Sequence, residues 1–304
     1  MLTRRGFAGL SLAPLIGNLG LHWSATAAAE GLAALGEAFA RIETDSAGRL
    51  GVAVLDTGSG ATAGHRANER FPMCSTFKAL AAAAVLARVD AGKEQLTRRI
   101  RVEQKDILAY APVSKQHVGA DMSVAELCEA MVTLSDNTAA NILLASMGGP
   151  SAITQLARSL GDDITRLDRI EPELNESTPG DVRDTTTPAA MAKNLKALAT
   201  ANALSAASRD QLIAWLVGCK TGDAKIRAGL PKSWRVGDKT GAGDHGSSND
   251  VAVIWPEGRA PVIVAVYLTE TTAPDAQRNA AHAAVGRAVA GAIQEVTTPP
   301  RRRP

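Results

Sequence analysis

Hydrophobic and polar positions divide the chain into a short β-type start, a helical middle and a β-type end. Short apolar or alternating segments between turn residues are typical of strands. The strands predicted in this way are residues 50–56, 61–66, 233–239, 250–255 and 261–269. The first two flank Gly58-Ser59-Gly60 and are expected to form a hairpin. Alanine-rich helices are predicted before the first strand (30–42) and after the last (274–296).

The middle of the chain has helix signals. Ser123-x-x-Glu126 is a capping box, and the apolar residues after it recur on one helical face. Thr187-Pro188 places a cap and a first-turn proline at another helix start, and Ser208-x-x-Gln211 is predicted to open a third. Further helices are predicted over 75–91, 137–147 and 150–160. Residues 162–186 show no periodicity, and irregular loops of this length are usually functional or disordered.

The order of these elements predicts an α/β fold. The simplest packing brings the strands from both ends into one sheet, covers it with the terminal helices and makes the helical middle a second lobe. We predict a single domain over 30–296, with a sheet lobe (about 30–66 and 219–296), a helical lobe (about 67–218) and the active site in the cleft between them. Residues 297–304 are predicted to be a disordered tail.

Composition supports a globular protein and gives no sign of a highly charged partner such as a nucleic acid. Of the 304 residues 45% are hydrophobic and 21% are charged, which excludes general disorder. The formal charge is +2, and loss of Arg4 and Arg5 with a signal peptide would leave 31 basic and 31 acidic side chains. A neutral mature chain gives no support to nucleic-acid binding.

The first 29 residues have the organisation of a signal peptide. Arg4-Arg5 precede an apolar stretch over 8–21 that is too short to span a membrane, and small residues follow over 24–29. The paired arginines with Phe7 resemble a twin-arginine signal, which directs the export of folded proteins. We predict cleavage near residues 27–29 and a periplasmic protein without a stable membrane anchor. An uncleaved anchor is the alternative.

The three cysteines, Cys74, Cys128 and Cys219, are an odd number, so at least one thiol is free or paired between molecules. Their wide spacing predicts neither a disulfide scaffold nor a zinc site. No metal and no cofactor are expected.

Residues 71–78, Phe-Pro-Met-Cys-Ser-Thr-Phe-Lys, are a candidate nucleophile site. Ser75 and Lys78 are three positions apart, so a helix would place a hydroxyl and an activating amine on one face. The unpaired N–H groups of a helix start would favour negative charge beside Ser75. Roughly one Ser-x-x-Lys is expected by chance in a chain of this length, so the motif alone does not establish catalysis.

Two further motifs have both a chemical and a structural interpretation. Ser135-Asp136-Asn137 can relay a proton and grip a substrate amide, but these residues also favour an ordinary helix N-cap. Lys239-Thr240-Gly241, which ends a predicted strand before Ala242, can bind an anionic group at a place where glycine permits close approach. Lys220-Thr221-Gly222 repeats the same residues after a helix end and is predicted to be a loop.

The irregular stretch contains a candidate general base. Arg169 and Asp184 can pair across its neck and close an Ω-loop of 16 residues. Within that loop, Glu171 can act as general base toward a water, with Asn175 as the second ligand of the water. A solvated acidic turn is the alternative interpretation.

Taken together and in this order, the four motifs resemble those of the class A serine β-lactamases. The resemblance covers residues 30–296. It implies an antiparallel five-stranded sheet flanked by terminal helices, plus an all-helical lobe, as in the β-lactamase and transpeptidase fold. It also implies that a monomeric enzyme hydrolyses the β-lactam amide bond of penicillins and cephalosporins and confers antibiotic resistance.

By this resemblance, the catalytic residues are Ser75, Lys78, Ser135 and Glu171. Ser75 is the acylated nucleophile, Lys78 keeps its proton network poised, and Ser135 passes a proton to the leaving nitrogen. Glu171 and Asn175 activate the water that hydrolyses the acyl-enzyme. Whether Lys78 or Glu171 is the base for acylation stays open.

The resemblance assigns the substrate contacts as well. Asn137 holds the side-chain amide of the substrate, and the Lys239-Thr240-Gly241 motif attracts its carboxylate through Lys239 and Thr240. The backbone N–H groups of Ser75 and Ala242 form the oxyanion hole, and Tyr110 is the aromatic residue of the cleft wall.

One cation of the family pattern is missing. Many members carry an arginine on the strand after Lys-Thr-Gly that binds the carboxylate, but Ser248 stands at this place. Lys225, Arg227 and Arg278 are the candidate replacements, and the sequence does not choose among them.

The cysteines also depart from parts of the family. Neither family disulfide is predicted, because Ala82 stands where a partner for Cys128 would be, and Gly243 stands where a partner for Cys74 would be. Gly243-Asp244 resembles the pattern of extended-spectrum cephalosporin hydrolysers.

Two other functions share most of these motifs: a penicillin-binding D-Ala-D-Ala peptidase, and a β-lactam sensor that stays acylated. Glu171 with Asn175 disfavours both, because a dedicated hydrolytic water is what releases the acyl group. The Glu171-Pro172 bond matches one that is cis in the class A family, and X-Pro is the only kind of bond for which cis is cheap.

Overall fold

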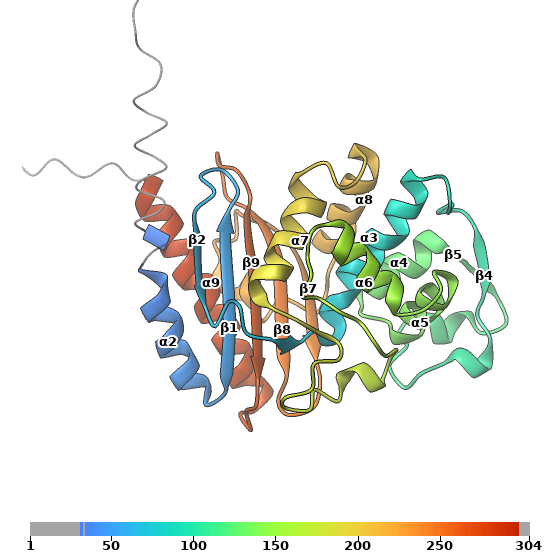
Figure 1. The fold of residues 1–304 in the computed structure, drawn as a ribbon, viewed down its shortest axis with the longest axis horizontal. Coiled ribbons are helices and arrows are strands. Elements are labelled where there is room, and N and C mark those ends of the chain that lie inside the picture. Colours follow the sequence, from blue (N-terminus) through green and yellow to red (C-terminus); the bar gives the residue numbers. More distant parts are fainter. Residues whose placement is uncertain (1–30, 33, 298–304) are drawn as a thin grey trace, which may run out of the picture.

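A five-stranded antiparallel sheet forms the centre of the computed structural model, which describes residues 31–32 and 34–297. The strand order is β2-β1-β9-β8-β7. The strands are β1 (Arg49–Asp56), β2 (Thr62–His65), β7 (Arg235–Ala242), β8 (Ser248–Trp255) and β9 (Val262–Thr269). The predicted α/β fold is confirmed, since strands from both ends of the chain share one sheet (Figure 1).

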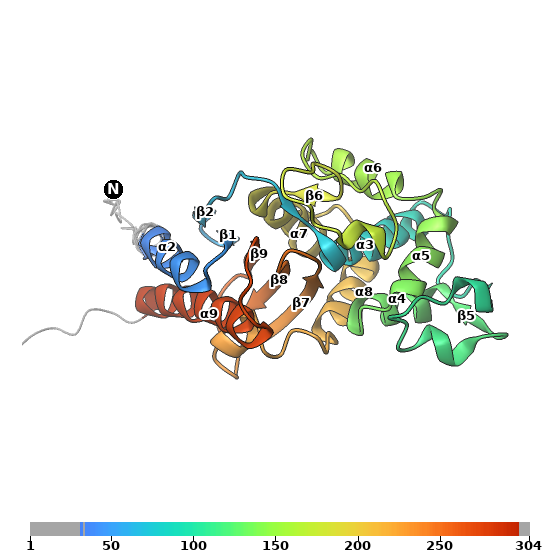
Figure 2. The ribbon, with the colours of Figure 1, turned by 90° about the horizontal axis from the view of Figure 1, so that it is seen from below.

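Alternate residues of the central strands enter two separate cores. Val52 and Val54 of β1 pack in the core that contains α2 (Leu35–Ser46) and α9 (Asp275–Thr297), whereas Leu55 packs with the helices of the middle. Because successive side chains of a strand point to opposite faces, a sheet covered on both sides needs apolar residues at nearly every position. This requirement explains the almost unbroken apolar run of β9 and the apolar second half of β8. Figure 2 shows α2 and α9 side by side on one side of the sheet.

The helices of the middle share a core with the other face of the sheet (Figures 1 and 2). They are α3 (Phe77–Asp90), α4 (Val124–Thr133), α5 (Asn137–Ser146), α6 (Ser151–Ser159), α7 (Pro188–Thr200) and α8 (Ala206–Val217). Of these, α7 and α8 are the ones that contact the strands of the sheet. Every residue of α3 from Phe77 to Leu86 is buried. A helix that is apolar on all sides belongs inside a core, and α3 therefore carries the residues near its start to the centre of the molecule.

The middle differs from the expected all-helical arrangement in one respect, because it also contains two short antiparallel ladders. One pairs β4 (Arg99–Arg101) with β5 (Asp121–Ser123), and the other pairs β3 (Phe71–Pro72) with β6 (Thr185–Thr186). Segments of two or three residues are too short to show a period in the sequence. The β3–β6 ladder joins the approach to Ser75 to the end of the irregular stretch.

The start of α8 differs from the prediction as well. Ser205 is its N-cap, and its hydroxyl accepts a hydrogen bond from the backbone N–H of Ser208. The hydroxyl of Ser208 instead donates to Asp90 at the end of α3, over 2.6 Å. Two serines three residues apart both fit a cap signature, and the tertiary contact with Asp90 decides between them. The capping box of Ser123 and Glu126 is confirmed.

No helix in the described part of the chain is long and apolar enough to cross a membrane. The predicted signal peptide and the predicted tail lie outside the described residues, apart from Thr297, which ends α9.

Candidate active site

Ser75 lies on a single 3₁₀ turn (Cys74–Thr76) rather than on the first turn of the α-helix, which begins at Phe77. The backbone of Cys74 explains the difference, since its φ of +43° lies in the left-handed region and is incompatible with α-helix. Gly241 of β7 packs directly on this turn. A Cβ at Gly241 would lie 2.9 Å from the carbonyl oxygen of Met73 and 3.2 Å from the nitrogen of Ser75. Glycine is therefore what brings β7 beside the candidate nucleophile.

Lys78 is completely buried below Ser75 and its ammonium group is surrounded by oxygen atoms. Nζ lies 2.9 Å from Oε1 of Glu171, 2.5 Å from Oδ1 of Asn137 and 2.8 Å from the carbonyl oxygen of Ser135. Burial lowers the pKa of Lys78, while the negative charge of Glu171 opposes this shift. The amine is therefore placed to exchange protons with its neighbours.

Glu171 joins this group from the irregular stretch. Its Oε1 accepts a hydrogen bond from Oγ of Ser75 over 3.2 Å, and its Oε2 accepts one from Nδ2 of Asn175 over 2.5 Å. The carboxyl group is buried, so the solvated acidic turn is excluded as an interpretation. The Glu171-Pro172 bond is cis, as the resemblance implied.

Ser135 lies between two lysines. Its Oγ is 3.0 Å from Nζ of Lys239 and 3.4 Å from Nζ of Lys78. The structure confirms the N-cap interpretation of the Ser-Asp-Asn motif for its middle residue and leaves the chemical interpretation of the other two as a prediction. Asp136 is the N-cap of α5 and also binds the backbone of Val113, whereas the side chains on either side of it line the site.

Lys239 and Thr240 lie within β7 and not at its end, because the strand continues to Ala242. Lys239 is fully buried and donates to the carbonyl oxygen of Thr240 over 2.8 Å. Burial lowers the pKa of Lys239 to about 8. The motif repeat at 220–222 forms a loop as predicted, but Thr221 lies next to the site, with its hydroxyl 2.5 Å from that of Thr240.

An open cavity of about 430 Å³ connects these groups. Tyr110, which is 51% exposed, stands at its wall, and the backbone N–H of Asn137 donates to the carbonyl oxygen of Tyr110. The lining residues used below are Ser75, Ser135, Asn137, Asn175, Lys225, Thr240, Ala242, Ser248 and Arg278. Lys78, Glu171 and Lys239 lie behind this wall.

Three residues of the site were missed by sequence reasoning. Asn141 clamps the backbone of Glu171: its Nδ2 donates to the carbonyl oxygen and its Oδ1 accepts from the N–H. Asn249 of β8 donates to the carbonyl oxygens of residues 72 and 73, just before the nucleophile turn. Thr221 is the third. Asn141 is one helical turn after Asn137, so the sequence carried a signal for it, whereas Asn249 lies in the polar stretch before the apolar run of β8 and had no distinct signal.

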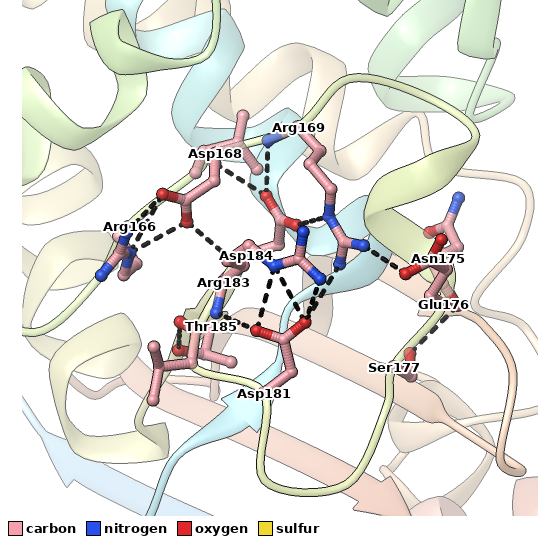
Figure 3. Close-up of polar contacts among 12 residues, drawn as sticks. Arg166, Asp168, Arg169, Asn175, Glu176, Ser177, Asp181, Arg183, Asp184 and Thr185 are labelled. Carbon is pink, nitrogen blue, oxygen red and sulfur yellow. Dashed lines mark hydrogen bonds and ion pairs between the residues drawn. The ribbon is translucent and has the colours of Figure 1, made fainter.

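The Ω-loop is closed by the predicted pair (Figure 3). Nε of Arg169 donates to Oδ2 of Asp184 over 2.6 Å, and two backbone N–H groups donate to Oδ1 of the same carboxylate. The guanidinium also pairs with Glu176 and, at 4.0 Å, with Asp181. Asp184 is buried, so Arg169 both neutralises a buried charge and fixes the neck of the loop.

The far side of the loop touches β7 and the nucleophile turn. The backbone N–H of Asp244 donates to the carbonyl oxygen of Asn175, and Oγ of Ser177 lies 3.4 Å from Sγ of Cys74. A Cβ at Gly243 would lie 2.6 Å from that carbonyl oxygen and 2.8 Å from Sγ of Cys74. All three cysteines are buried free thiols, and burial raises the pKa of Cys74 to about 12.

Comparison with known proteins agrees with this geometry. The model of the Beta-lactamase enzyme family matches residues 34–293. The chain is 50% identical to β-lactamase CTX-M-8 of Citrobacter amalonaticus over 84% of its length and 86% of that protein. It is 47% identical to β-lactamase L2 of Stenotrophomonas maltophilia over 94% and 98% of the two chains.

Solved structures give the same result. An ancestral (GNCA) class A β-lactamase superposes with a TM-score of 0.84 at 63% identity, covering 85% of this chain and 99% of the other. A putative class A β-lactamase, PenP from Rhodopseudomonas palustris, has a TM-score of 0.84 at 59% identity over the same shares.

The fold and the site define a β-lactam hydrolase, an enzyme that opens the β-lactam amide bond and so confers antibiotic resistance. Within that group, the chain belongs to the class A serine β-lactamases.

Replacement of Arg169 by alanine is expected to lower the free energy of unfolding by about 3 kcal/mol, because it leaves the buried carboxylate of Asp184 without its partner. Arg166→Ala is the matched control: its pair with Asp168 is 40% and 24% exposed and should contribute less than about 1 kcal/mol. Urea unfolding of both variants measures the difference. Equal losses in the two would contradict the anchoring role of Arg169.

Proposed function

We propose that Ser75 is the residue acylated by the β-lactam and that Glu171 drives its release. One observation carries the proposal: a single carboxylate oxygen, Oε1 of Glu171, lies within 3.2 Å of the hydroxyl of Ser75 and 2.9 Å of the ammonium of Lys78. A serine hydroxyl in contact with a base is the arrangement that activates a weak nucleophile, and here the base is itself held by the ammonium of Lys78.

Acylation follows from these contacts. Oγ of Ser75 attacks the β-lactam carbonyl while its proton passes to Glu171, which it contacts directly, or to Lys78, which contacts the same carboxylate oxygen. The N–H groups of Ser75 and Ala242 receive the oxyanion, a contribution of about 10²–10³ per donor. When the C–N bond breaks, Ser135 passes a proton to the leaving nitrogen and can regain one from Lys78 or Lys239, its two neighbours.

Deacylation requires a water beside the ester, and Glu171 and Asn175 provide its ligands. Nδ2 of Asn175 is bound to Oε2 of Glu171, whereas its Oδ1 is buried and has no partner within the described residues. A buried acceptor without a partner is the feature expected of a site that holds water. The water donates one hydrogen to Asn175 and loses the other to Glu171 as it attacks the acyl carbon. Proton return to Ser75 completes hydrolysis.

The buried position of Glu171 also separates this function from its two alternatives. A penicillin-binding peptidase and a β-lactam sensor both form the acyl-enzyme. Neither needs a carboxylate 3.2 Å from the nucleophile, and here Asn141 holds that carboxylate in place through two hydrogen bonds to the backbone of Glu171. Penicillins and cephalosporins are the proposed substrates. Asn137 binds their side-chain amide, and Tyr110 forms the wall of the cleft beside them.

Lys225 is the proposed replacement for the missing arginine. It lines the cavity, is 9% exposed and donates to Oγ of Ser248 over 2.5 Å, with no carboxylate within ion-pair distance among the described residues. A buried ammonium without a counter-ion is costly unless a ligand supplies the negative charge. Arg227 is paired with Asp238 and absent from the lining, and Arg278 is paired with Asp275 at the cavity mouth.

We further propose that residues 1–29 direct twin-arginine export to the periplasm. The mature protein is proposed to be a monomer with a single domain over 30–296, whose helical lobe covers 67–218. The support is the motif at the N-terminus. Mass analysis of the exported protein should place the mature N-terminus near residues 27–29, and Arg4→Lys with Arg5→Lys should keep the enzyme in the cytoplasm. Export of that double variant would refute the route.

Glu171→Gln should accumulate a covalent acyl-enzyme and lower kcat by about 10²- to 10⁴-fold, because general-base assistance is lost while the nucleophile stays. Intact-protein mass spectrometry after mixing with a chromogenic cephalosporin detects the adduct. Ser75→Ala should form no adduct. If the wild type itself accumulates the adduct without turnover, the protein is a sensor and not a hydrolase.

Lys225→Ala should raise KM by about 10- to 100-fold with little change in kcat, since a charge-assisted hydrogen bond to the carboxylate is lost from ground and transition states alike. Arg278→Ala is the control and should change KM less than about threefold, because that side chain already has a partner. If steady-state kinetics show a larger rise in KM for Arg278→Ala than for Lys225→Ala, Arg278 is the residue that binds the substrate carboxylate.

A further inference from the structure

The two Lys-Thr-Gly motifs of the chain lie beside each other in the structure. The copy at 239–241 is part of β7, and the copy at 220–222 lies in the loop after α8. No step of the proposed reaction involves the loop copy. Yet Thr221 of the loop copy lines the active-site cavity together with Thr240, its counterpart on the strand. The repeated motif is therefore part of the site.

Close packing holds the loop copy against the strand. A Cβ at Gly222 would overlap Oδ2 of Asp238 on β7 and would lie 2.7 Å from its Cγ, so glycine is what permits this approach. On the other side of Thr221, the backbone N–H of Lys220 donates to the carbonyl oxygen of Thr133 at the end of α4, over 2.9 Å. The residues on both sides of Thr221 are thus fixed.

The side chains of Thr221 and Thr240 meet through their hydroxyl groups, which are 2.5 Å apart. Within the described residues, the hydroxyl of Thr240 has no other hydrogen-bond partner, and that of Thr221 has only Sγ of Cys219, at 3.3 Å. Each hydroxyl has one proton and two lone pairs. One of the two protons lies between the oxygens, and the other is free to point elsewhere.

The chemistry of the ligand decides which proton lies between the oxygens. A carboxylate accepts hydrogen bonds and donates none, so Thr240 can bind it only when the single proton of Thr240 points into the cavity. The proton between the two oxygens must then come from Thr221. The buried thiol of Cys219 can donate to a remaining lone pair of Thr221. In such a chain, each hydrogen bond strengthens the next.

We propose that Thr221 is a positioning residue for substrate binding: its hydroxyl donates to that of Thr240 and so holds Thr240 as a donor toward the substrate carboxylate. Thr221 acts through Thr240 and not through a contact of its own with the substrate. The inference rests on the proposed role of Thr240 as a ligand of the carboxylate.

Loss of the Thr221 hydroxyl should weaken binding and spare the chemical step. The hydroxyl of Thr240 would then rotate freely, and its hydrogen bond to the carboxylate would lose the strengthening from Thr221. A partial loss of one hydrogen bond corresponds to a rise in KM of about 3- to 10-fold. The change in kcat should stay below about twofold, because the carboxylate is bound in ground and transition states alike.

The test is steady-state kinetics with a chromogenic cephalosporin. Thr221→Val keeps the shape of the side chain without its hydroxyl and should show this rise in KM. Thr221→Ser keeps a hydroxyl and should stay within about twofold of the wild type. Thr221→Ala should match Thr221→Val, because both lack the hydroxyl although they differ in size. A serine variant as impaired as the valine variant would assign the effect to packing and overturn the inference.

Thr165→Val is the matched control. The hydroxyl of Thr165 forms a similar buried pair, 2.6 Å from that of Thr186, and neither residue lines the cavity. The KM of this variant should stay within about twofold of the wild type. A rise equal to that in Thr221→Val would show that loss of any buried hydroxyl pair disturbs the site, and the inference would fail.

A double-mutant cycle with Thr240→Val tests whether the two hydroxyls act as one unit. Thr240→Val alone should raise KM at least as much as Thr221→Val does. In the Thr240→Val background, Thr221→Val should add less than about twofold. Additive effects would give Thr221 its own contact with the substrate and would overturn the inference.

The same cycle separates this inference from the proposed carboxylate site. A raised KM in Thr240→Val with an unchanged KM in Thr221→Val refutes the role of Thr221 alone. An unchanged KM in Thr240→Val removes Thr240 from the carboxylate site, and the role of Thr221 falls with it. Neither result bears on acylation, because accumulation of the adduct in Glu171→Gln tests the roles of Ser75 and Glu171 independently.

Discussion

The contact between the ammonium of Lys78 and the carboxylate of Glu171 is the constraint on which the site depends. Both side chains are withdrawn from water, and their attraction offsets that cost only when the remaining N–H groups and lone pairs are also bound. Asn137 accepts from Lys78, and Asn175 and Ser75 donate to Glu171. The residues proposed to carry out the reaction are therefore also the residues that stabilise the buried pair.

Three parts of the fold must pack before this contact can form. The buried helix α3 carries Lys78, the sheet holds the nucleophile turn through Asn249 and Gly241, and the Ω-loop delivers Glu171. The loop has little regular structure of its own, so its position depends on Asp184 at the neck and on the backbone clamp by an α5 side chain. A displacement of the loop would move Glu171, the proposed general base, and would leave Ser75 in place beside α3 and β7.

Sequence patterns predicted the sheet, most of the helices and the four motifs, because each has a local signature. The 3₁₀ turn at Ser75 was not predictable, since the left-handed backbone of Cys74 has no local signature in the sequence and Cys74 lies between β7 and the loop, which are distant in sequence. The cap at Ser205 was missed because the contact of Ser208 with Asp90 is between residues far apart in sequence. Local sequence signals therefore identify the candidate site residues, whereas contacts between residues far apart in sequence determine the backbone conformation around them.

The choice of Lys225 over two arginines shows what a structure adds to a motif. All three are basic residues at plausible sequence positions, and only the pattern of pairing separates them. The two arginines have carboxylate partners, whereas Lys225 and Lys239 face the cavity region with hydroxyl and carbonyl oxygens only. Burial lowers the pKa of both ammonium groups, and an anionic substrate bound beside them would favour their charged form. If Lys225 has the proposed role, the fold is prepared for a carboxylate before the substrate binds, and Ser248 supplies the hydroxyl that orients Lys225.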